Sequence, residues 1–342
     1  MPESDLRRWI RVVGGTLSAS QGRNLSSHEA ERVFSLMLEG GGTEGQVGAL
    51  LSLIRGRGAA ADELVGFARA ARARLRFPRL PQHSVVVATT RLGKLQSPPI
   101  GLASAAAAAA AGAKVLVQAS GRVPDGGPTL GDLWQDLVGD RCLSADQAER
   151  QLADRGLACW CPNQEDPGWE RLLCVEEEVG LRSVPDQVSK LLAPGHAPLL
   201  VPSMAGPVLG LAGEALASLG HERCIILQGI EGSIDPSVAE RSRGMLIEEG
   251  MKSPLRLLPE DLGLSWPHEP HQTHEDRLES ARQATARALM GIAPEMHVAQ
   301  LGGAILLRLS GLYRDFASAA TAAREVIENG TASAMLYDVP GA

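Results

Sequence analysis

Apolar side chains recur at helical spacing through the first 75 residues, and no strand pattern appears there. Ser26 has capping-box spacing to Glu29, and Thr43 follows a run of glycines in a position to cap the next helix. Four apolar residues of that next helix share one face: Val47, Leu50, Leu51 and Ile54. A turn at 56–58 precedes a further helix from Asp62 to Leu75, so this segment predicts a helical domain.

The pattern changes after residue 78, where short β-branched runs alternate with helical segments. Runs at 84–88 and 114–118 flank an alanine-rich helix, and a second strand–helix–strand unit spans 198–228. Such units favour parallel strands joined by crossovers. We therefore expect an α/β protein, with a small N-terminal helical domain (residues 1–78) and a larger domain (79–342). The larger domain has a mainly parallel central sheet flanked by helices.

The C-terminal third of the chain predicts helices around an irregular stretch. Residues 254–272 are rich in proline and histidine and predict an irregular connection. Long helices are expected over roughly 275–291 and 296–328, where apolar residues recur at helical spacing.

Composition narrows the class of protein. The chain has 342 residues, of which 44% are apolar and 3% are aromatic, and its net charge is −7. Few aromatic residues argue against a nucleic-acid surface of stacked rings, and the acidic balance restricts any anion-binding surface to a local patch. Five cysteines are an odd number and argue against a disulfide scaffold.

Two further sequence features predict where in the cell the protein is found. The longest apolar stretch, 100–113, is shorter than the ~20 residues of a membrane span. The first residues lack the basic and apolar regions of a signal peptide. We expect a protein of the reducing cytoplasm with no membrane partner.

Several segments, in their order and spacing, resemble the anthranilate phosphoribosyltransferase family. The hinge-like stretch EVGLRS at 178–183 leads to LLAP at 191–194. The other segments that carry the resemblance are QVGALLSLIR at 46–55, ELVGFARA at 63–70, LGDLWQDL at 130–137, LPEDLG at 258–263 and the helix around 304–330. The resemblance covers most of the chain.

The resemblance implies how the domains are arranged and what they bind. It implies that the helical domain forms a homodimer, and that a segment near 165–190 returns to that domain. In the family, phosphoribosyl pyrophosphate binds between the domains with magnesium, and anthranilate lies nearby. These properties are expectations for this chain.

The loops that would hold the phosphates depart from the family pattern. The family's first phosphate loop is rich in glycine, since glycines let backbone N–H groups approach a pyrophosphate. Here the stretch 88–96 keeps Gly93 and adds the cations Arg91 and Lys94. The family's Asn and Ser-Thr at the next helix start fall on 99–102, which carries no hydroxyl group. Its Lys-His-Gly falls on Val117, Gln118 and Ala119, so the phosphate-binding lysine is absent.

The acidic loop at 229–235 keeps only part of the family's magnesium pair. Asp235 stands at the second acidic position, Ile234 stands at the first, and Glu231 adds another carboxylate. Two carboxylates in such a loop could hold one Mg²⁺, because this ion takes few protein ligands and keeps waters. The alternative is a solvated acidic turn.

The place of the family's substrate-binding arginine is occupied by Glu176, by spacing from the hinge stretch. A carboxylate there repels the carboxylate of anthranilate, so we expect that the chain is not an anthranilate phosphoribosyltransferase. The pattern resembles a divergent branch of the family with degenerate loops, to which Lys190 after the hinge also points. Some members of that branch bind nucleic acid through basic residues in the cleft.

Two functions remain open, and no catalytic residue is assigned. The first is binding of a polyanion, either nucleic acid or a nucleotide, in the interdomain cleft. The alternative is a magnesium-dependent phosphoribosyl or pentosyl transferase with a different acceptor, in which Glu231 and Asp235 hold the metal. The predicted phosphate- or ligand-binding residues are Thr89, Thr90, Arg91, Gly93, Lys94, Gln118, Ser120, Arg122, Arg182 and Lys190.

Three other sequence patterns are candidate sites. The densest basic run could form a stripe that tracks phosphates, but the acidic balance favours a solvated helix face. It comprises Arg55, Arg57, Arg69, Arg72, Arg74, Arg76 and Arg79. His268, His271 and His274 are separated by prolines that prevent a regular helix, so a metal site is disfavoured. Cys159 and Cys161 lack a second cysteine pair and suggest buried residues near a strand.

Overall fold

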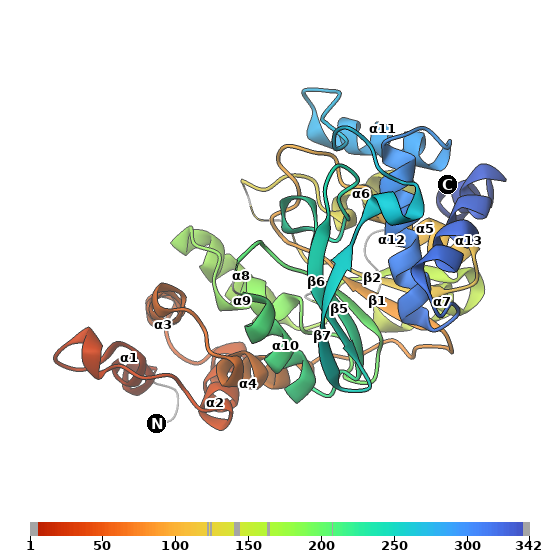
Figure 1. Cartoon of the computed structure of the whole chain (residues 1–342). Coiled ribbons are helices and arrows are strands. Elements are labelled where there is room, and N and C mark those ends of the chain that lie inside the picture. Colours follow the sequence, from red (N-terminus) through yellow and green to blue (C-terminus); the bar gives the residue numbers. More distant parts are fainter. Residues whose placement is uncertain are drawn as a thin grey trace.

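The N-terminal segment is helical in the computed structural model, which describes residues 6–121, 123, 125–139, 144–162, 165–206 and 208–337. The predicted capping box of Ser26 with Glu29 is present, and Thr43 caps the next helix as predicted, in a second capping box with Gln46. The elements are α1 (Arg7–Gly14), the 3-10 helix η1 (Ala19–Gln21), α2 (Ser27–Leu38), α3 (Glu44–Arg57) and α4 (Ala61–Arg72). Figure 1 shows them on one side of the sheet, with α8, α9 and α10 between them and the strands.

A seven-stranded sheet with the order β3-β2-β1-β4-β5-β6-β7 forms the centre of the larger part. β3, β2, β1, β4 and β5 are mutually parallel, and β6 and β7 extend the sheet as an antiparallel hairpin. The strands are β1 (Ser84–Ala88), β2 (Lys114–Gln118), β3 (Leu157–Trp160), β4 (Leu199–Pro202), β5 (Arg223–Gln228), β6 (Ser242–Glu248) and β7 (Met251–Leu257). The fold class expected from the sequence is confirmed.

Both faces of the sheet are covered, because alternate residues of each strand enter different cores. Val85 and Val87 of β1 join a core built with the alanine-rich α5, while Val86 and Ala88 join a core shared with the N-terminal helices. This burial explains why β1 and β4 are fully buried runs of mostly apolar residues. The remaining helices are α5 (Gly101–Ala110), α6 (Leu130–Val138), α7 (Ala145–Arg155), α8 (Pro167–Val179), α9 (Val184–Ser189), α10 (Val208–Ser218), α11 (Arg277–Leu289), α12 (Glu295–Ser310), α13 (Phe316–Glu328) and α14 (Thr331–Tyr337).

The structure corrects two predicted elements near the C-terminus. The stretch 254–272 is not wholly irregular, since its first residues belong to the edge strand β7 and Pro259–Leu262 form the 3-10 helix η4. Pro254 is compatible with β7 because this strand lies at the edge of the sheet. The helix expected over 296–328 is two helices, α12 and α13, because Gly311 takes a left-handed conformation with φ of 81°.

The segment after β3 packs back onto the N-terminal helices. α8 contacts α2 and α3, and α9 contacts α4. This packing brings the hinge-like stretch next to the loops at one edge of the sheet. The boundary at 78/79 and the homodimer stay predictions. None of the helices in the described part of the chain combines the length and apolar character that crossing a bilayer requires.

Candidate functional site

The two loops that the sequence assigned to phosphates and metal lie side by side. β1 and β5 are parallel, so the segments that follow them leave the sheet at the same edge. The Glu231 carboxylate accepts hydrogen bonds from the backbone N–H groups of Leu95, Gln96 and Ser97 at 2.8, 3.0 and 2.8 Å. The Ser97 hydroxyl donates a further bond at 2.6 Å. The Glu231 carboxylate therefore stabilises the conformation of the loop after β1.

These bonds change the acidity of Glu231. Burial alone raises the pKa of the carboxyl group, but the Ser97 hydroxyl and the three backbone N–H groups lower it below its ordinary value. Glu231 is thus ionised at neutral pH. Its negative charge is satisfied by the protein.

Lys94 is buried beside Asp235. Its ammonium group lies 2.9 Å from the Asp235 carboxylate, and both side chains are at most 2% exposed. The same carboxylate oxygen accepts a bond from the Ile100 N–H at 3.0 Å, and the other oxygen has no hydrogen-bond partner among the described residues. The only positive charge bonded to Asp235 in the described part of the chain is therefore supplied by Lys94.

Arg91 forms the second buried ion pair. Its guanidinium donates to the Glu176 carboxylate, to the Gly121 carbonyl at 2.9 Å and to Glu177 at 3.5 Å. Glu176 also accepts bonds from the Ser183 N–H and hydroxyl. The residue in the place of the family's arginine is therefore neutralised by Arg91. We name Arg91, Lys94, Glu176, Glu231 and Asp235 the sealed cluster.

The other residues predicted near this loop pack around the sealed cluster. Thr89 donates to the Gln118 carbonyl at 3.0 Å, and Thr90 accepts from the Leu92 N–H at 3.3 Å. Gln118 is buried and donates to the Ser189 carbonyl, and Ser120 is buried. Arg122 lies outside the described residues.

Gly93 is needed where it stands. It has a φ of +64°, and a Cβ there would lie 2.1 Å from the Gly127 carbonyl oxygen. Gly93 therefore allows its loop to pack closely against the loop that contains Gly127.

The space left inside the sealed cluster does not fit a magnesium ion with its ligands. A cavity of about 20 Å³ lies between Thr89, Lys94 and Asp235, which is room for about one water molecule. Glu231 faces four donors and Asp235 faces an ammonium group. A second cation would stand against Lys94. The predicted magnesium pair stays a prediction, and these contacts argue against it.

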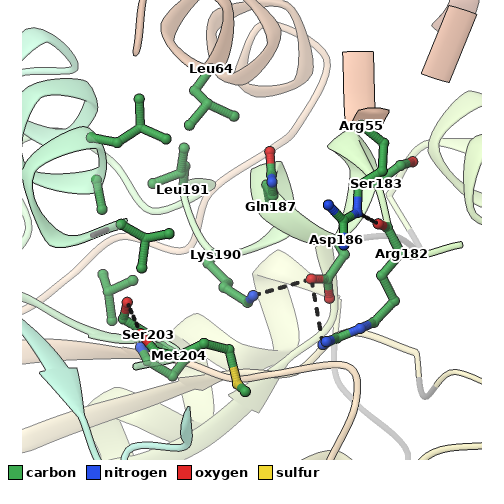
Figure 2. A pocket seen from close by; sticks show the side chains of 15 residues that line it. Arg55, Leu64, Arg182, Ser183, Asp186, Gln187, Lys190, Leu191, Ser203 and Met204 are labelled. Atoms are coloured by element: carbon green, nitrogen blue, oxygen red, sulfur yellow. Dashed lines mark hydrogen bonds and ion pairs between the residues drawn. The ribbon is translucent and has the colours of Figure 1, made fainter. Parts of the chain in front are cut away.

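A larger pocket of about 290 Å³ opens between the N-terminal helices, α9 and α10. Figure 2 shows its polar wall, where Arg55, Arg182, Asp186 and Lys190 lie close together. Other lining residues are apolar or uncharged: Leu64, Ser183, Gln187, Leu191, Val201, Pro202, Ser203, Met204, Val208, Leu211 and Ala212. We call this space the open pocket.

The cations of the open pocket are partly exposed. Lys190 lies 3.2 Å from the Asp186 carboxylate and is 19% exposed, and Arg182 lies 3.9 Å from the same carboxylate and is 35% exposed. Arg55 is exposed and donates its Nε–H to the Arg182 carbonyl at 2.8 Å. Arg182 and Lys190 thus share one carboxylate, and Arg55 lines the same pocket, which leaves positive charge facing it.

Sequence reasoning found part of this pocket and missed part. Arg182 and Lys190 were predicted as ligand contacts, whereas Arg55 was assigned to a surface run and Asp186 was not considered. One signal was present, because Arg182, Asp186 and Lys190 are spaced four residues apart, which is the spacing of ion pairs on a helix. Nothing in the local sequence indicates that Arg55 and the start of α10 meet at this face.

The arginines of the basic run bind the protein itself. Arg72 donates to the Leu191 carbonyl at 2.8 Å, and Arg74 forms two bonds to Asp166 at 2.7 and 3.0 Å. Arg76 pairs with Asp146 on α7, and Arg79 lies 3.9 Å from Glu149 on the same helix. This run joins the N-terminal helices to the sheet part, an arrangement that neither earlier hypothesis for the run described.

The remaining sequence patterns form no metal centre in the residues described. No three His, Cys, Asp or Glu side chains gather there as metal ligands would. The rings of His268 and His271 lie 5.9 Å apart, and Cys159 and Cys161 are buried at β3.

Comparisons with known proteins agree with this geometry. The chain matches the glycosyl transferase family helical bundle domain over residues 18–75 and the glycosyl transferase family a/b domain over residues 96–333. It is 26% identical over 333 residues to an anthranilate phosphoribosyltransferase of Methanothermobacter marburgensis, covering 92% of this chain and 94% of that protein. It is 31% identical over 250 residues to the enzyme of that name from Rubrobacter xylanophilus, covering 72% of each.

Solved structures of the same name share the fold. Anthranilate phosphoribosyltransferase from Thermus thermophilus superposes with a TM-score of 0.79 at 22% identity, covering 92% of this chain and 95% of that one. The enzyme from Saccharomyces cerevisiae, in complex with PRPP and Mg, superposes with a TM-score of 0.79 at 17% identity, covering 97% and 95%.

Proposed function

The chain belongs to the glycosyl transferase family that includes the anthranilate phosphoribosyltransferases, and we propose that it binds a phosphorylated small molecule in the open pocket. The proposal rests on which cations are free to contact a ligand. Arg55, Arg182 and Lys190 face a space of about 290 Å³, whereas Arg91 and Lys94 are sealed in ion pairs.

The shape and charge of the open pocket favour a ligand of nucleotide size. A volume near 300 Å³ is at the lower end of ordinary ligand sites, which combine apolar walls with a few polar groups. Arginine presents a planar fork of N–H donors that matches a phosphate, and Lys190 adds a point charge. The apolar wall around Leu211 and Met204 suits an uncharged ring.

Transfer of phosphoribose to anthranilate is disfavoured by the same contacts. The Saccharomyces cerevisiae relative was solved with PRPP and Mg, but here Lys94 pairs with the carboxylate where that metal is expected. Glu176 stands in place of the substrate-binding arginine and already pairs with Arg91. A carboxylate substrate finds no free cation at this position.

Binding of nucleic acid is the weaker form of the anion-binding hypothesis. A long polyanion needs several cations along a surface, and its affinity falls steeply with salt. The run from Arg72 to Arg79 is engaged with the protein's own carbonyls and carboxylates. A single pocket with three cations suits a mononucleotide better.

The proposal is tested by calorimetry with adenosine 5′-monophosphate as the probe. We expect binding without magnesium, and a loss of about a hundredfold or more in the double variant Arg55→Gln/Arg182→Gln, because each of the two lost charge-assisted bonds contributes ~1.5–3 kcal/mol. Arg256→Gln on the edge strand β7 is the matched control, and it should bind like the wild type.

Other outcomes of the titration would overturn the proposal. An absence of heat with adenosine 5′-monophosphate and with inorganic pyrophosphate removes it. Binding of phosphoribosyl pyrophosphate that requires magnesium and is lost in Asp235→Asn would instead support the divergent transferase. Binding of oligonucleotides far above that of the mononucleotide, with steep salt dependence, would support nucleic acid.

A homodimer through the N-terminal helices and a cytoplasmic location also belong to the proposal. Light scattering during gel filtration tests the dimer, and a mass of one chain would contradict it.

A further inference from the structure

A second cavity lies at the opposite edge of the sheet from the open pocket. Its volume is about 350 Å³, against about 290 Å³ for the open pocket. Because β1, β4 and β5 are parallel, the residues that begin these strands meet at one edge, and there they surround this cavity together with the end of α12. The lining residues are Leu80, Pro81, Gln82, His83, Ser84, His196, Ala197, Pro198, Arg223, Ser310 and Gly311. We call this space the rear cavity.

Arg223 brings to the rear cavity a positive charge that the described part of the protein does not neutralise. It is the first residue of β5 and is partly exposed. Its guanidinium has no hydrogen-bond or ion-pair partner among the described residues, and its nitrogen atoms are not enclosed. The end of α12 keeps it in place, since a Cβ on Gly311 would lie 2.9 Å from Nη1 and a helix C-terminus favours a cation. No carboxylate is present among the described residues that line this cavity.

His83 adds a second polar group with a free nitrogen. Its Nδ1 lies 3.3 Å from the Ser310 carbonyl oxygen, which only accepts, so Nδ1 carries a proton and donates it. The other ring nitrogen, Nε2, has no partner in the described part of the chain and is not enclosed. The His83 backbone has a φ of 60°, which is uncommon for a residue with a side chain. Such conformations are frequent at ligand sites.

His196 supplies a third group from another segment, the turn before β4. It is exposed, and its ring has no hydrogen-bond partner within the described residues. We infer that the rear cavity binds a phosphate group, with Arg223 as the charged contact and the two histidines as further hydrogen-bond partners. This site is separate from the open pocket and does not rest on the proposed function.

The chemistry of these three side chains suits a phosphate better than a carboxylate. The oxygens of a phosphate point in four directions and can meet groups from three segments, whereas a carboxylate has two oxygens in one plane. The Arg223 guanidinium matches two phosphate oxygens at once. The His83 Nε2 can bond a phosphate in either state, because it accepts from a P–OH when neutral and donates to a phosphate oxygen when protonated.

The test follows the histidine rings by NMR in protein labelled with ¹⁵N at histidine. The probe is inorganic phosphate at pH 7, with sodium chloride of equal ionic strength as the blank. We expect the ring signals of His83 and His196, assigned with His83→Asn and His196→Asn, to shift and to saturate. Arg223→Gln should weaken the binding about tenfold or more, which is the effect of one bond to a charged group. Sulfate has the same shape but no O–H at this pH, so it should bind about threefold or more weakly.

The signals distinguish the rear cavity from the open pocket, because no histidine is present among the described residues that line the open pocket. Arg55→Gln/Arg182→Gln should therefore leave the histidine shifts unchanged, whatever calorimetry shows for the proposed function. Arg243→Gln is the matched control, since it removes an exposed arginine at the other end of the paired strands β5 and β6.

Three results would overturn the inference. They are ring signals that do not move with phosphate, an unchanged affinity in Arg223→Gln, and sulfate binding equal to that of phosphate. The comparison of phosphate with sulfate uses the wild type, so it decides the question even if Arg223→Gln does not fold.

Discussion

The sealed cluster and the open pocket contain the same kinds of side chain but leave different charges for a ligand. In the sealed cluster, Arg91 and Lys94 each meet a carboxylate, and all four side chains are at most 2% exposed. In the open pocket, Lys190 and Arg182 share Asp186 and are 19% and 35% exposed, and Arg55 lines the same pocket. A cation in a phosphate loop is therefore not a phosphate ligand unless its own partners leave it free.

The difference follows from the cost of burying a charge. A cation removed from water must be paired, and once it is paired it has little attraction left for a ligand. The sealed cluster therefore gives structure rather than binding, since it ties the loop after β1 to α8 and to the loop after β5. A partly exposed cation keeps its hydration and can exchange it for a phosphate.

The largest effect is expected for Glu176→Arg. This change removes the buried carboxylate of Arg91, leaves only the longer contact to Glu177 and adds a second guanidinium, so we expect a loss of about 4–5 kcal/mol in unfolding free energy. Urea denaturation measures the loss. Glu178→Arg, on an exposed position of the same helix, is the control and should change stability by less than about 0.5 kcal/mol. A loss below about 1 kcal/mol at Glu176 would show that the pair is not sealed.

A somewhat smaller loss is expected for Lys94→Met. The change leaves the Asp235 carboxylate buried without its cation and should lower the unfolding free energy by about 3–4 kcal/mol. The double variant Lys94→Met/Asp235→Asn removes the unpaired charge and should regain most of the loss. Magnesium provides a further check by thermal denaturation. If a saturating concentration of magnesium raises the melting temperature of the wild type, Asp235 still accepts a metal. Our interpretation that Lys94 occupies this carboxylate is then wrong.

Much of the fold could be predicted from the sequence, because its signals are local. The capping boxes at Ser26 and Thr43 and the β-branched run 84–88 specify helix starts and a buried strand within a few residues. The break between α12 and α13 was not predicted, because the apolar residues on both sides of Gly311 recur at helical spacing. The strand β7 was not predicted because proline is unfavourable in a central strand. An edge strand tolerates Pro254, but the sequence does not show that β7 lies at the edge.

The candidate site could be predicted only in part, because its contacts join distant segments. The proximity of the loops after β1 and β5 follows from parallel topology, and the structure places them together. The partner of Arg91 lies 85 residues away, and the partner of Lys94 lies 141 residues away. No local pattern shows that these charges cancel. The open pocket likewise needs α3, α9 and β4 to meet.

The smallest expected effect is the contribution of Glu231 to the loss of stability in acid. Glu231 belongs to the sealed cluster, where the protein itself supplies the hydrogen bonds to the carboxylate. Its carboxylate is satisfied by protein donors, and its pKa is lowered from 4.5, although burial acts to raise it. A carboxyl group with a lowered folded-state pKa stabilises the fold above its unfolded value, and this stability is lost as pH falls through the folded value.

We therefore expect the wild type to lose stability as pH falls below about 4.5, and Glu231→Gln to lose less over the same range. Urea denaturation across this range measures the difference, which should not exceed about 1 kcal/mol because the group is only partly buried and is screened by solvent. Glu240→Gln, at an exposed position, should keep the wild-type slope. Parallel slopes for the wild type and Glu231→Gln would mean that the bonds from 95–97 do not hold the charge, and the loop would then be free to bind a ligand.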